Sequence, residues 1–365
     1  MHFSVALAVL VGSASSAILW DGRFNTFSSS TDLNNWSWSN QVGPYQYYIH
    51  GPSAVTSYIN LSPSYKNPAD SGSTQGAKFT LDSTSFWNGQ TMRRTELIPQ
   101  TTAAIASGKV WYHFSMMRSA TNAPSIYREH QINFFESHFT EMKSGWISGA
   151  AGNSNPALQW FVGGQSKWSV NWDAGVWHNV AYEIVRFRLK YVSVKYTNKA
   201  KDFSANTVAF WHSTGSNPLT LTVAAVSAST SSNGADWHLG VLELPVSGQA
   251  DTNEDFYFSG VYIESGSLTT SVAGPGGVVV SSSAKPSTSS STSKPASGVS
   301  SSTAKPTTLS TSTKPAPVST TSSAPAPAGT IAKWGQCGGL NWGGSGTCVE
   351  GTKCTFSSDY YSQCL

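Results

Sequence analysis

Charge is scarce in this chain of 365 residues: only 11% of them are Asp, Glu, Lys or Arg, and the formal net charge at pH 7 is +3. No basic stripe runs along the sequence, so we expect no nucleic-acid partner. Beyond the N-terminus, no apolar run approaches the roughly 20 residues that a membrane-spanning helix needs, and we expect no membrane partner. Sustained helical periodicity is also missing, which argues against a helical fold.

Several sequence motifs of metal, phosphate and nucleophile sites are missing too. The sequence has no metal-ligand spacing, no glycine-rich phosphate loop and no serine nucleophile motif. We therefore expect no metal and no organic cofactor, and we expect a monomer. Cysteine is absent from most of the chain: there are four cysteines, all within the last thirty-two residues.

The C-terminal segment combines these cysteines with aromatic residues. A segment so short cannot bury enough apolar surface to fold alone, and two disulfides would each add roughly 3 kcal/mol by restricting the unfolded chain. Four cysteines allow three pairings, and the spacing does not choose among them. Because the core is small, the rings must lie largely on the surface, where flat rings can stack on sugars. The aromatic residues are Trp334, Trp342, Tyr360 and Tyr361.

The run Trp-Gly-Gln-Cys-Gly-Gly at 334–339 and the cysteine spacing closely resemble the fungal family 1 carbohydrate-binding module. The resemblance covers 330–365 and implies a small disulfide-knotted module that binds cellulose. It implies the disulfides Cys337–Cys354 and Cys348–Cys364. It also implies a flat cellulose-binding face, made by Trp334, Tyr360, Tyr361 and Gln363.

The first residues are typical of a secretory signal. An apolar run is followed by small residues ending at Ala17, so we expect a signal peptide over 1–17 and a mature chain that begins at Ile18. An oxidising, extracellular location suits a disulfide knot. In a secreted protein the sequons at Asn35 and Asn60 are acceptors for N-glycosylation.

Composition changes sharply near residue 271. From 271 to 329 the chain is mostly Ser, Thr, Pro and Ala, with a loose repeat of Lys-Pro pairs. Such a segment has no core-forming residues, and it predicts a disordered, O-glycosylated linker. It would tether the C-terminal module to a large domain over 18–270.

The large domain is predicted to be all-β. Aromatic residues, Ser, Asn and Gly are abundant, and apolar residues alternate with polar ones in short runs separated by turn residues. Many strands with such punctuation indicate a β-jelly-roll sandwich. The expected strands lie at 110–116, 126–139, 158–162, 168–172, 177–185, 208–211, 219–226, 238–244 and 255–263.

Two glutamates stand out as candidate catalytic groups, because glycosidic cleavage commonly needs two carboxyl groups. Glu96 shares a strand face with Arg94, whose charge should keep it ionised, so we expect it to act as the base. Glu136 has aromatic neighbours that should raise its pKa by desolvation, so we expect it to act as the acid. The alternative is that Glu96 only pairs with a neighbouring arginine and that Glu136 is an ordinary solvated residue.

Five segments support a catalytic role through a resemblance to glycoside hydrolase family 131. They are 93–97, 129–139, 177–184, 237–242 and 255–266. The resemblance spans nearly all of 18–266 and implies a β-jelly roll with a wide cleft. It implies a broad fungal β-glucanase that cleaves β-1,3, β-1,6 and β-1,4 linkages with inversion, and it maps the catalytic carboxylates onto Glu96 and Glu136.

Other polar residues are candidates for the cleft. Strict alternation places Glu136 and His138 on the same strand face as His130, and Gln131 and Asn133 on the opposite face, unless a bulge intervenes. The candidates are Arg94, His130, Gln131, Asn133, His138, His212 and His238.

Residues 185–201 depart from the family pattern. This stretch carries six basic residues, and in the family the preceding run passes directly into 202–207. We expect either a retained intron in the gene sequence or a genuine hairpin insertion.

Two alternatives to a glucanase remain. The run Arg-Thr-Glu-Leu is shared with jelly-roll polysaccharide lyases, although Ile98 stands where those enzymes have Arg. A non-catalytic glucan-binding protein is the third possibility.

Overall fold

The computed structural model describes residues 16–186, 206–230, 236–275, 329–331, 336–338, 345–358 and 361–364. The chain divides into two compact units, Met1–Val280 and Ser281–Leu365. Helices are short: α1 is Val55–Tyr58, and three 3-10 helices are η1 Phe24–Thr26, η2 Ser30–Asn35 and η3 Pro63–Tyr65. Within the described ranges, no helix has the length and apolar character needed to cross a membrane.

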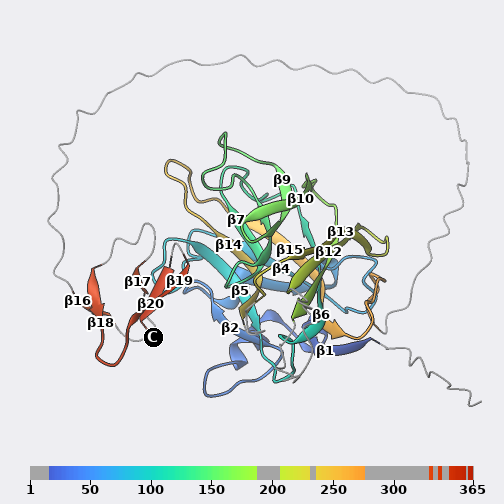
Figure 1. Ribbon diagram of the computed structural model, residues 1–365, viewed down its shortest axis with the longest axis horizontal. Coiled ribbons are helices and arrows are strands. Elements are labelled where there is room, and N and C mark those ends of the chain that lie inside the picture. Colours follow the sequence, from blue (N-terminus) through green and yellow to red (C-terminus); the bar gives the residue numbers. More distant parts are fainter. Residues whose placement is uncertain are drawn as a thin grey trace, which may run out of the picture. The chain divides into compact units, whose positions relative to one another are not determined.

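The first unit is a β-jelly-roll sandwich of two antiparallel sheets (Figure 1). The eight-stranded sheet has the order β13-β12-β11-β6-β15-β4-β3, with β1 paired to β15. Its strands are β1 Ala17–Asp21, β3 Ile59–Ser62, β4 Gly76–Leu81, β6 Gly108–Arg118, β11 His178–Arg186, β12 Thr207–Thr214, β13 Thr220–Ser227 and β15 Glu254–Ser265. The seven-stranded sheet has the order β10-β9-β8-β7-β14-β5-β2. Its strands are β2 Tyr45–Ile49, β5 Arg93–Pro99, β7 His130–Phe135, β8 Thr140–Ser144, β9 Ala157–Val162, β10 Gln165–Asn171 and β14 Trp237–Glu243.

Every expected strand has a counterpart, but the sequence missed several others. Alternation identified β6 and β9 to β15, whereas β1 to β4 and β8 were not anticipated. The run 126–139 is not one strand: β7 occupies only its middle, and the chain then turns into β8.

Aromatic side chains from both sheets fill the space between them. Tyr112 of β6 meets Phe135 of β7 and Trp237 of β14, with ring centroids 5.1 and 5.2 Å apart. Trp160 of β9 stacks on Phe210 of β12 at 4.8 Å. Such pairs add about 0.5–1.5 kcal/mol each beyond the area that they bury, so they hold the two sheets in one register.

A buried ionic cluster also joins the sheets. Arg93 of β5 binds Glu243 of β14 in its own sheet and reaches Glu254 of β15 in the opposite sheet at 3.2 Å. His130 of β7 lies 2.6 Å from the same Glu254. Arg128 adds a second guanidinium on Glu243 and also pairs with Asp251 at 2.7 Å. The charges balance when His130 is protonated, with three cations facing three carboxylates. Each charge in the cluster therefore has a partner of opposite sign, which avoids the cost of an unpaired buried charge.

The packed domain is slightly longer than expected. Ala273 is buried, and Arg23 donates to the carbonyl of Pro275, so the linker cannot begin at 271. Most of the expected linker, the signal peptide up to residue 15 and residues 187–205 lie outside the described residues. Of the segment 185–201, only the start is described: Val185 pairs with Thr207, and Arg186 continues β11.

Five short strands lie within the described residues of the second unit. They are β16 Gly329–Ile331, β17 Gln336–Gly338, β18 Gly346–Cys348, β19 Cys354–Ser358 and β20 Tyr361–Cys364. Disulfides join Cys337 to Cys354 and Cys348 to Cys364, which is the pairing that the resemblance implied.

We predict that His130 makes the domain more stable at neutral than at alkaline pH. Burial alone would lower the pKa of His130, but the carboxylates of Glu254 and Glu243 outweigh it and raise the pKa to about 9. A raised folded-state pKa gives stability that is complete below the unfolded value near 6.5 and is lost as the pH rises through 9. The loss is on the order of 3 kcal/mol and is measurable by urea unfolding between pH 6 and pH 10.

The matched variant is His130→Gln, which cannot carry the proton. It should be less stable than the wild type at pH 6, and the fall in stability that the wild type shows between about pH 6.5 and pH 9 should be largely absent. An unchanged alkaline slope in this variant would contradict the assignment.

Candidate active site

Alternation along β5 separates two sets of side chains. Thr95 donates to the carbonyl of Thr80 in β4, and Leu97 lies in the core, so both face the opposite sheet. Arg94 and Glu96 consequently face outward from the seven-stranded sheet. We call this side of the sheet the outer face.

Glu96 is ionised and sealed on the outer face. The guanidinium of Arg94 donates to both carboxylate oxygens of Glu96, at 2.7 and 2.8 Å. His238 Nδ1 lies 2.5 Å from Glu96 Oε2. Burial alone would raise the pKa of Glu96, but the charge of Arg94 and the hydrogen bonds from His238 and Arg94 outweigh it, and the pKa lies below its ordinary value. The side chain is 0% exposed. A base that receives a proton directly from water needs an accessible oxygen, so this geometry does not match the direct role expected for Glu96.

Glu136 lies at the other edge of the same histidine. His238 Nε2 is 3.3 Å from Glu136 Oε2, while Nδ1 holds Glu96. The Glu136 side chain is 43% exposed, in contrast to that of Glu96, so its aromatic neighbours do not bury it as the sequence led us to expect. The two carboxylates therefore stand one imidazole ring and two contacts apart.

Stacked rings hold the histidine in place. The ring of Phe134 lies 4.6 Å from that of His238 and 5.2 Å from that of His138, nearly parallel to both. His138 Nδ1 contacts Glu141 at 3.0 Å. Burial alone would lower the pKa of His138, but the charges of Glu141 and Glu136 raise it. His238 can therefore rotate little, and its two nitrogens keep their partners.

A paired backbone irregularity brings these side chains to the outer face. Asn133 has a left-handed φ of 47°, Gly240 has a φ of 138°, and the β7–β14 register shifts between His238 and Val241. Asn133 Oδ1 accepts the N–H of Gly240 at 3.0 Å. This bulge changes the alternation of β7: Ile132 and Phe135 both lie in the core, so Phe134 faces outward.

The cleft candidates separate into two sets. The structure brings Arg94, His138 and His238 together with the two glutamates, and Gln131 lies further along the outer face, 3.1 Å from Glu129. His130, Asn133 and His212 lie elsewhere.

Each of these three residues makes structural contacts away from the two glutamates. His130 belongs to the buried ionic cluster between the sheets, because the bulge lies after it and leaves it facing inward. Asn133 is fully buried and braces the bulge. His212 lies in the eight-stranded sheet, where its Nε2 is 3.1 Å from His178 Nδ1 and burial lowers the pKa of both rings to about 4.

The sequence did not single out Tyr48 and Trp87, which flank the site. Burial and the charge of Glu96 raise the pKa of Tyr48 to about 12, and its ring is 6.2 Å from that of Trp87. Arg94 lies over the Trp87 ring at 5.7 Å. The aromatic run 45–48 was a signal for β2, whereas nothing local linked Trp87 to Arg94.

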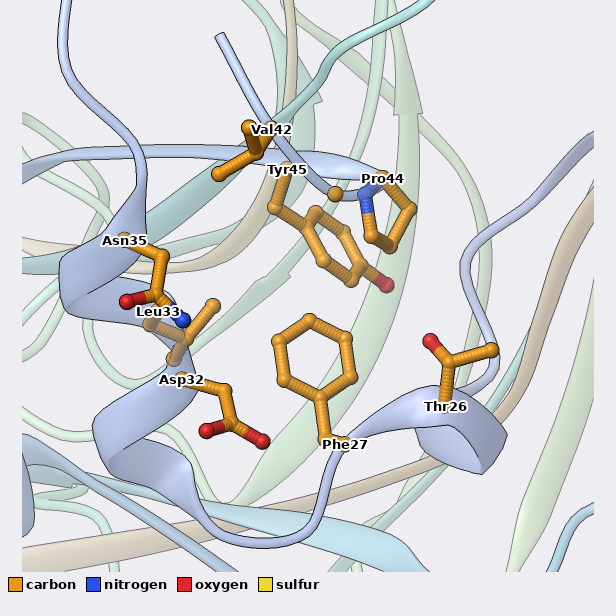
Figure 2. Close-up of a pocket in the computed structure, with 9 residues that line it drawn as sticks. Thr26, Phe27, Asp32, Leu33, Asn35, Val42, Pro44 and Tyr45 are labelled. Carbon is orange, nitrogen blue, oxygen red and sulfur yellow. The ribbon is translucent and has the colours of Figure 1, made fainter. Parts of the chain in front are cut away.

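A hollow of about 340 Å³ lies apart from these groups. Figure 2 shows Phe27 and Tyr45 facing each other across it, with Asp32 and Asn35 at its side. Asp32 accepts hydrogen bonds from the Ser28 N–H and hydroxyl at 2.7 and 2.8 Å, so its carboxylate stabilises the start of η2. We do not assign the hollow a catalytic role.

The described residues include a histidine–carboxylate cluster with the geometry of a metal site, namely His130, Glu243 and Glu254. The guanidinium groups of Arg93 and Arg128 already neutralise these carboxylates. A metal ion would have to displace them, so these residues do not fit one.

A jelly roll whose outer face carries two carboxyl groups bridged by a histidine has the groups that a glycoside hydrolase uses. Residues 18–269 match the model of the glycoside hydrolase 131 catalytic N-terminal domain, and residues 333–361 match that of the fungal cellulose binding domain. The chain belongs to glycoside hydrolase family 131, and it carries a cellulose-binding module at its C-terminal end.

Two solved structures are similar to the large domain. The catalytic domain of a family 131 β-glucanase from Podospora anserina is 70% identical, with a TM-score of 0.65, covering 71% of this chain and 100% of that one. The family 131 catalytic domain from Coprinopsis cinerea is 45% identical, with a TM-score of 0.61, covering 70% of this chain and 97% of that one.

Two curated relatives match a short stretch of the chain. Endoglucanase EG-1 of Hypocrea jecorina is 55% identical over 40 residues, which are 11% of this chain and 9% of that protein. Exoglucanase 2 of the same organism is 62% identical over 32 residues, which are 9% of this chain and 7% of that protein. The chain thus spans less than a tenth of the length of these relatives.

We predict that Gly240→Ala disrupts the site. A Cβ at this position would lie 2.2 Å from the carbonyl oxygen of Thr95 and 2.9 Å from Glu96 Cα, both rigid backbone atoms of β5. The change should cost about 3 kcal/mol or more and displace Glu96, which thermal unfolding and a glucan hydrolysis assay would detect together.

Gly248→Ala is the matched control. Gly248 also has a positive φ, of 81°, but a Cβ there would meet nothing within 4 Å. It should cost only about 1 kcal/mol from backbone strain and leave hydrolysis intact. Equal effects of the two changes would show that the bulge does not position the site.

Proposed function

We infer that this protein is a secreted β-glucanase of broad specificity that hydrolyses β-1,3, β-1,6 and β-1,4 linkages with inversion. The observation that carries this proposal is the exposed carboxyl of Glu136, joined through His238 to the sealed and ionised Glu96. Arg94 is fully engaged by Glu96, so it does not offer the free positive charge that uronate substrates need. This favours neutral glucans over uronate-containing chains.

Glu136 is the acid in this proposal. Its side chain is exposed enough to turn toward a bound sugar, and it lies 3.3 Å from His238 Nε2. A protonated Glu136 can donate to the glycosidic oxygen as the bond to the anomeric carbon breaks. The proton then leaves with the departing sugar as its new hydroxyl.

His238 is the base in this proposal, and Glu96 fixes its tautomer. Glu96 accepts the Nδ1 proton, which fixes the tautomer whose Nε2 carries a lone pair. Inversion requires the acid and the base to stand roughly 6.5–9.5 Å apart, so a bound sugar has to turn Glu136 away from the ring. Nε2 can then take a proton from the attacking water. After the products leave, the 3.3 Å contact lets that proton pass from His238 to Glu136 and restores both groups.

We predict that Glu136→Gln lowers kcat on soluble β-glucan by about 10²–10⁴-fold and changes KM much less, because it removes the proton donor but keeps the shape. His238→Gln should cause a comparable loss. Reducing-sugar release measures both, and His212→Gln serves as a control that should retain activity.

Rescue by azide distinguishes the base from the acid. Azide should restore activity to His238→Ala and Glu96→Ala, because a strong nucleophile needs no base, and it should not restore Glu136→Ala. Rescue of Glu136→Ala alone would reverse the assignment. Products that absorb in the ultraviolet would identify a lyase, and a complete lack of reducing sugar would identify a glucan-binding protein.

The C-terminal module is proposed to hold the enzyme on cellulose or cell walls by its aromatic face. Trp334 and Tyr360 lie outside the described residues; Tyr361 and Gln363 belong to β20, which pairs with both β17 and β19. Adjacent strands and two disulfides give a rigid support for flat rings. Secretion and N-glycosylation at Asn35, which is exposed, and at Asn60, which is half-buried, form part of the same proposal.

We predict that Trp334→Ala weakens binding of the full chain to insoluble cellulose by roughly tenfold, because stacking and burial of one ring contribute about 1.4 kcal/mol. Hydrolysis of a soluble glucan should stay unchanged. A pull-down assay and a soluble assay on the same preparation measure the two effects. Equal loss in both would contradict a role limited to targeting.

A further inference from the structure

Trp38 is an exposed aromatic residue that lies outside the core. It is also not part of the proposed catalytic chain, by which we mean Glu96, His238 and Glu136. Its side chain is 66% exposed, the largest fraction among the exposed large hydrophobic residues of the described ranges. An indole this exposed contributes little to the burial that stabilises the fold. An exposed ring next to a proposed active site therefore requires an explanation.

The backbone holds Trp38 in a fixed position. Ser37 and Asn40 exchange two backbone hydrogen bonds of 2.9 and 3.0 Å across the turn whose tip carries Trp38. The Asn40 side chain donates to the carbonyl of Asn35 at 3.0 Å. The ring is thus presented on a closed turn.

Other rings support Trp38 from behind. Trp36 lies 4.8 Å away in an edge-on arrangement, and its indole N–H donates to Gln100. Tyr48 lies 5.1 Å from Trp38 and 5.6 Å from Trp36. This packing leaves part of the Trp38 ring free for a ligand.

A continuous set of contacts connects Trp38 to the catalytic chain. Tyr48 touches Trp87, Arg94 lies over Trp87, and Arg94 binds Glu96. The charges of Glu96 and Glu136 both act on the Tyr48 hydroxyl, so the tyrosine lies between Trp38 and the reacting groups.

The chemistry around Trp38 is neutral and polar. Residues 34–49 contain no Asp, Glu, Lys or Arg, and the turn supplies hydroxyl and amide groups from Ser37, Ser39, Asn40 and Gln41. A flat apolar ring bordered by uncharged hydrogen-bonding groups suits a pyranose ring, which has an apolar face and a rim of hydroxyls.

We propose that Trp38, backed by Trp36 and Tyr48, is a binding subsite for a glucosyl unit remote from the scissile bond. This proposal rests on the proposed function and deepens it. A glucan chain that passes the Glu136–His238 pair continues over Tyr48 and Trp87 and places one ring on Trp38. The subsite makes long chains better substrates than short ones.

The test compares the full-length wild type with Trp38→Ala on soluble glucan oligosaccharides from three to six units. We expect kcat/KM on the hexasaccharide to fall roughly fivefold to tenfold, and the loss to shrink as the substrate shortens. Trp38→Tyr should recover most of the loss. Leu221→Ala, which removes a 50% exposed residue of β13, is the control and should behave as the wild type.

A second measurement separates this proposal from the proposed function. In a Glu136→Gln background, calorimetry with the hexasaccharide should show a similar drop in affinity on adding Trp38→Ala. Because both proteins keep the C-terminal module, its contribution cancels. If the wild type hydrolyses no glucan but the affinity still drops, the proposed function fails and the subsite stands.

Three outcomes would overturn the subsite. An equal loss on all chain lengths would indicate a structural role for Trp38. A loss that disappears in Asn35→Gln protein would indicate that the ring covers the glycan of the neighbouring sequon. A dimer that Trp38→Ala converts to a monomer, with kinetics unchanged, would assign the ring to contact between copies.

Discussion

The outer face of this enzyme depends on one paired backbone irregularity, the bulge at Asn133 and Gly240. Without it, β7 would keep strict alternation, and the face that carries Gln131 would also carry Asn133 and Phe135 rather than Phe134. The side chain of Asn133 closes the bulge by accepting the N–H of Gly240. Only glycine fits there, because Thr95 and Glu96 approach so closely.

The same region shows how a sheet can hold charges in two different ways. Inside the sandwich, Arg93, Arg128 and His130 neutralise their carboxylates completely, and the cluster joins the sheets. On the outer face, Arg94 and Glu96 form a buried pair, but His238 extends that pair to the exposed Glu136. The two differ in what their accessible carboxylate contacts: Asp251, 35% exposed, pairs with Arg128, whereas Glu136, 43% exposed, contacts a histidine. Rigid strands keep the members of the outer-face arrangement at hydrogen-bonding distance.

Much of this organisation could be predicted from local sequence. Alternation and turn residues indicated a jelly roll, and Arg94 and Glu96 were placed correctly on one face because β5 is regular. The prediction failed for His130 because the bulge lies in the middle of β7 and has no clear local signature. It failed for His212 because nothing in the sequence tells which sheet a histidine-bearing strand joins. The linker was expected too early, since Ala273 packs against distant residues.

The sequence by itself determined the all-β class of the large domain and the cysteine content of the C-terminal module, because these follow from periodicity, composition and motif. Only the tertiary structure decided that Glu96 is sealed, that His238 bridges it to Glu136, and that Tyr48 and Trp87 flank the site. The physical reason is that solvent access and carboxylate spacing are set by strands that are distant in sequence and meet through hydrogen bonds. Neither quantity is encoded in any short segment of the chain.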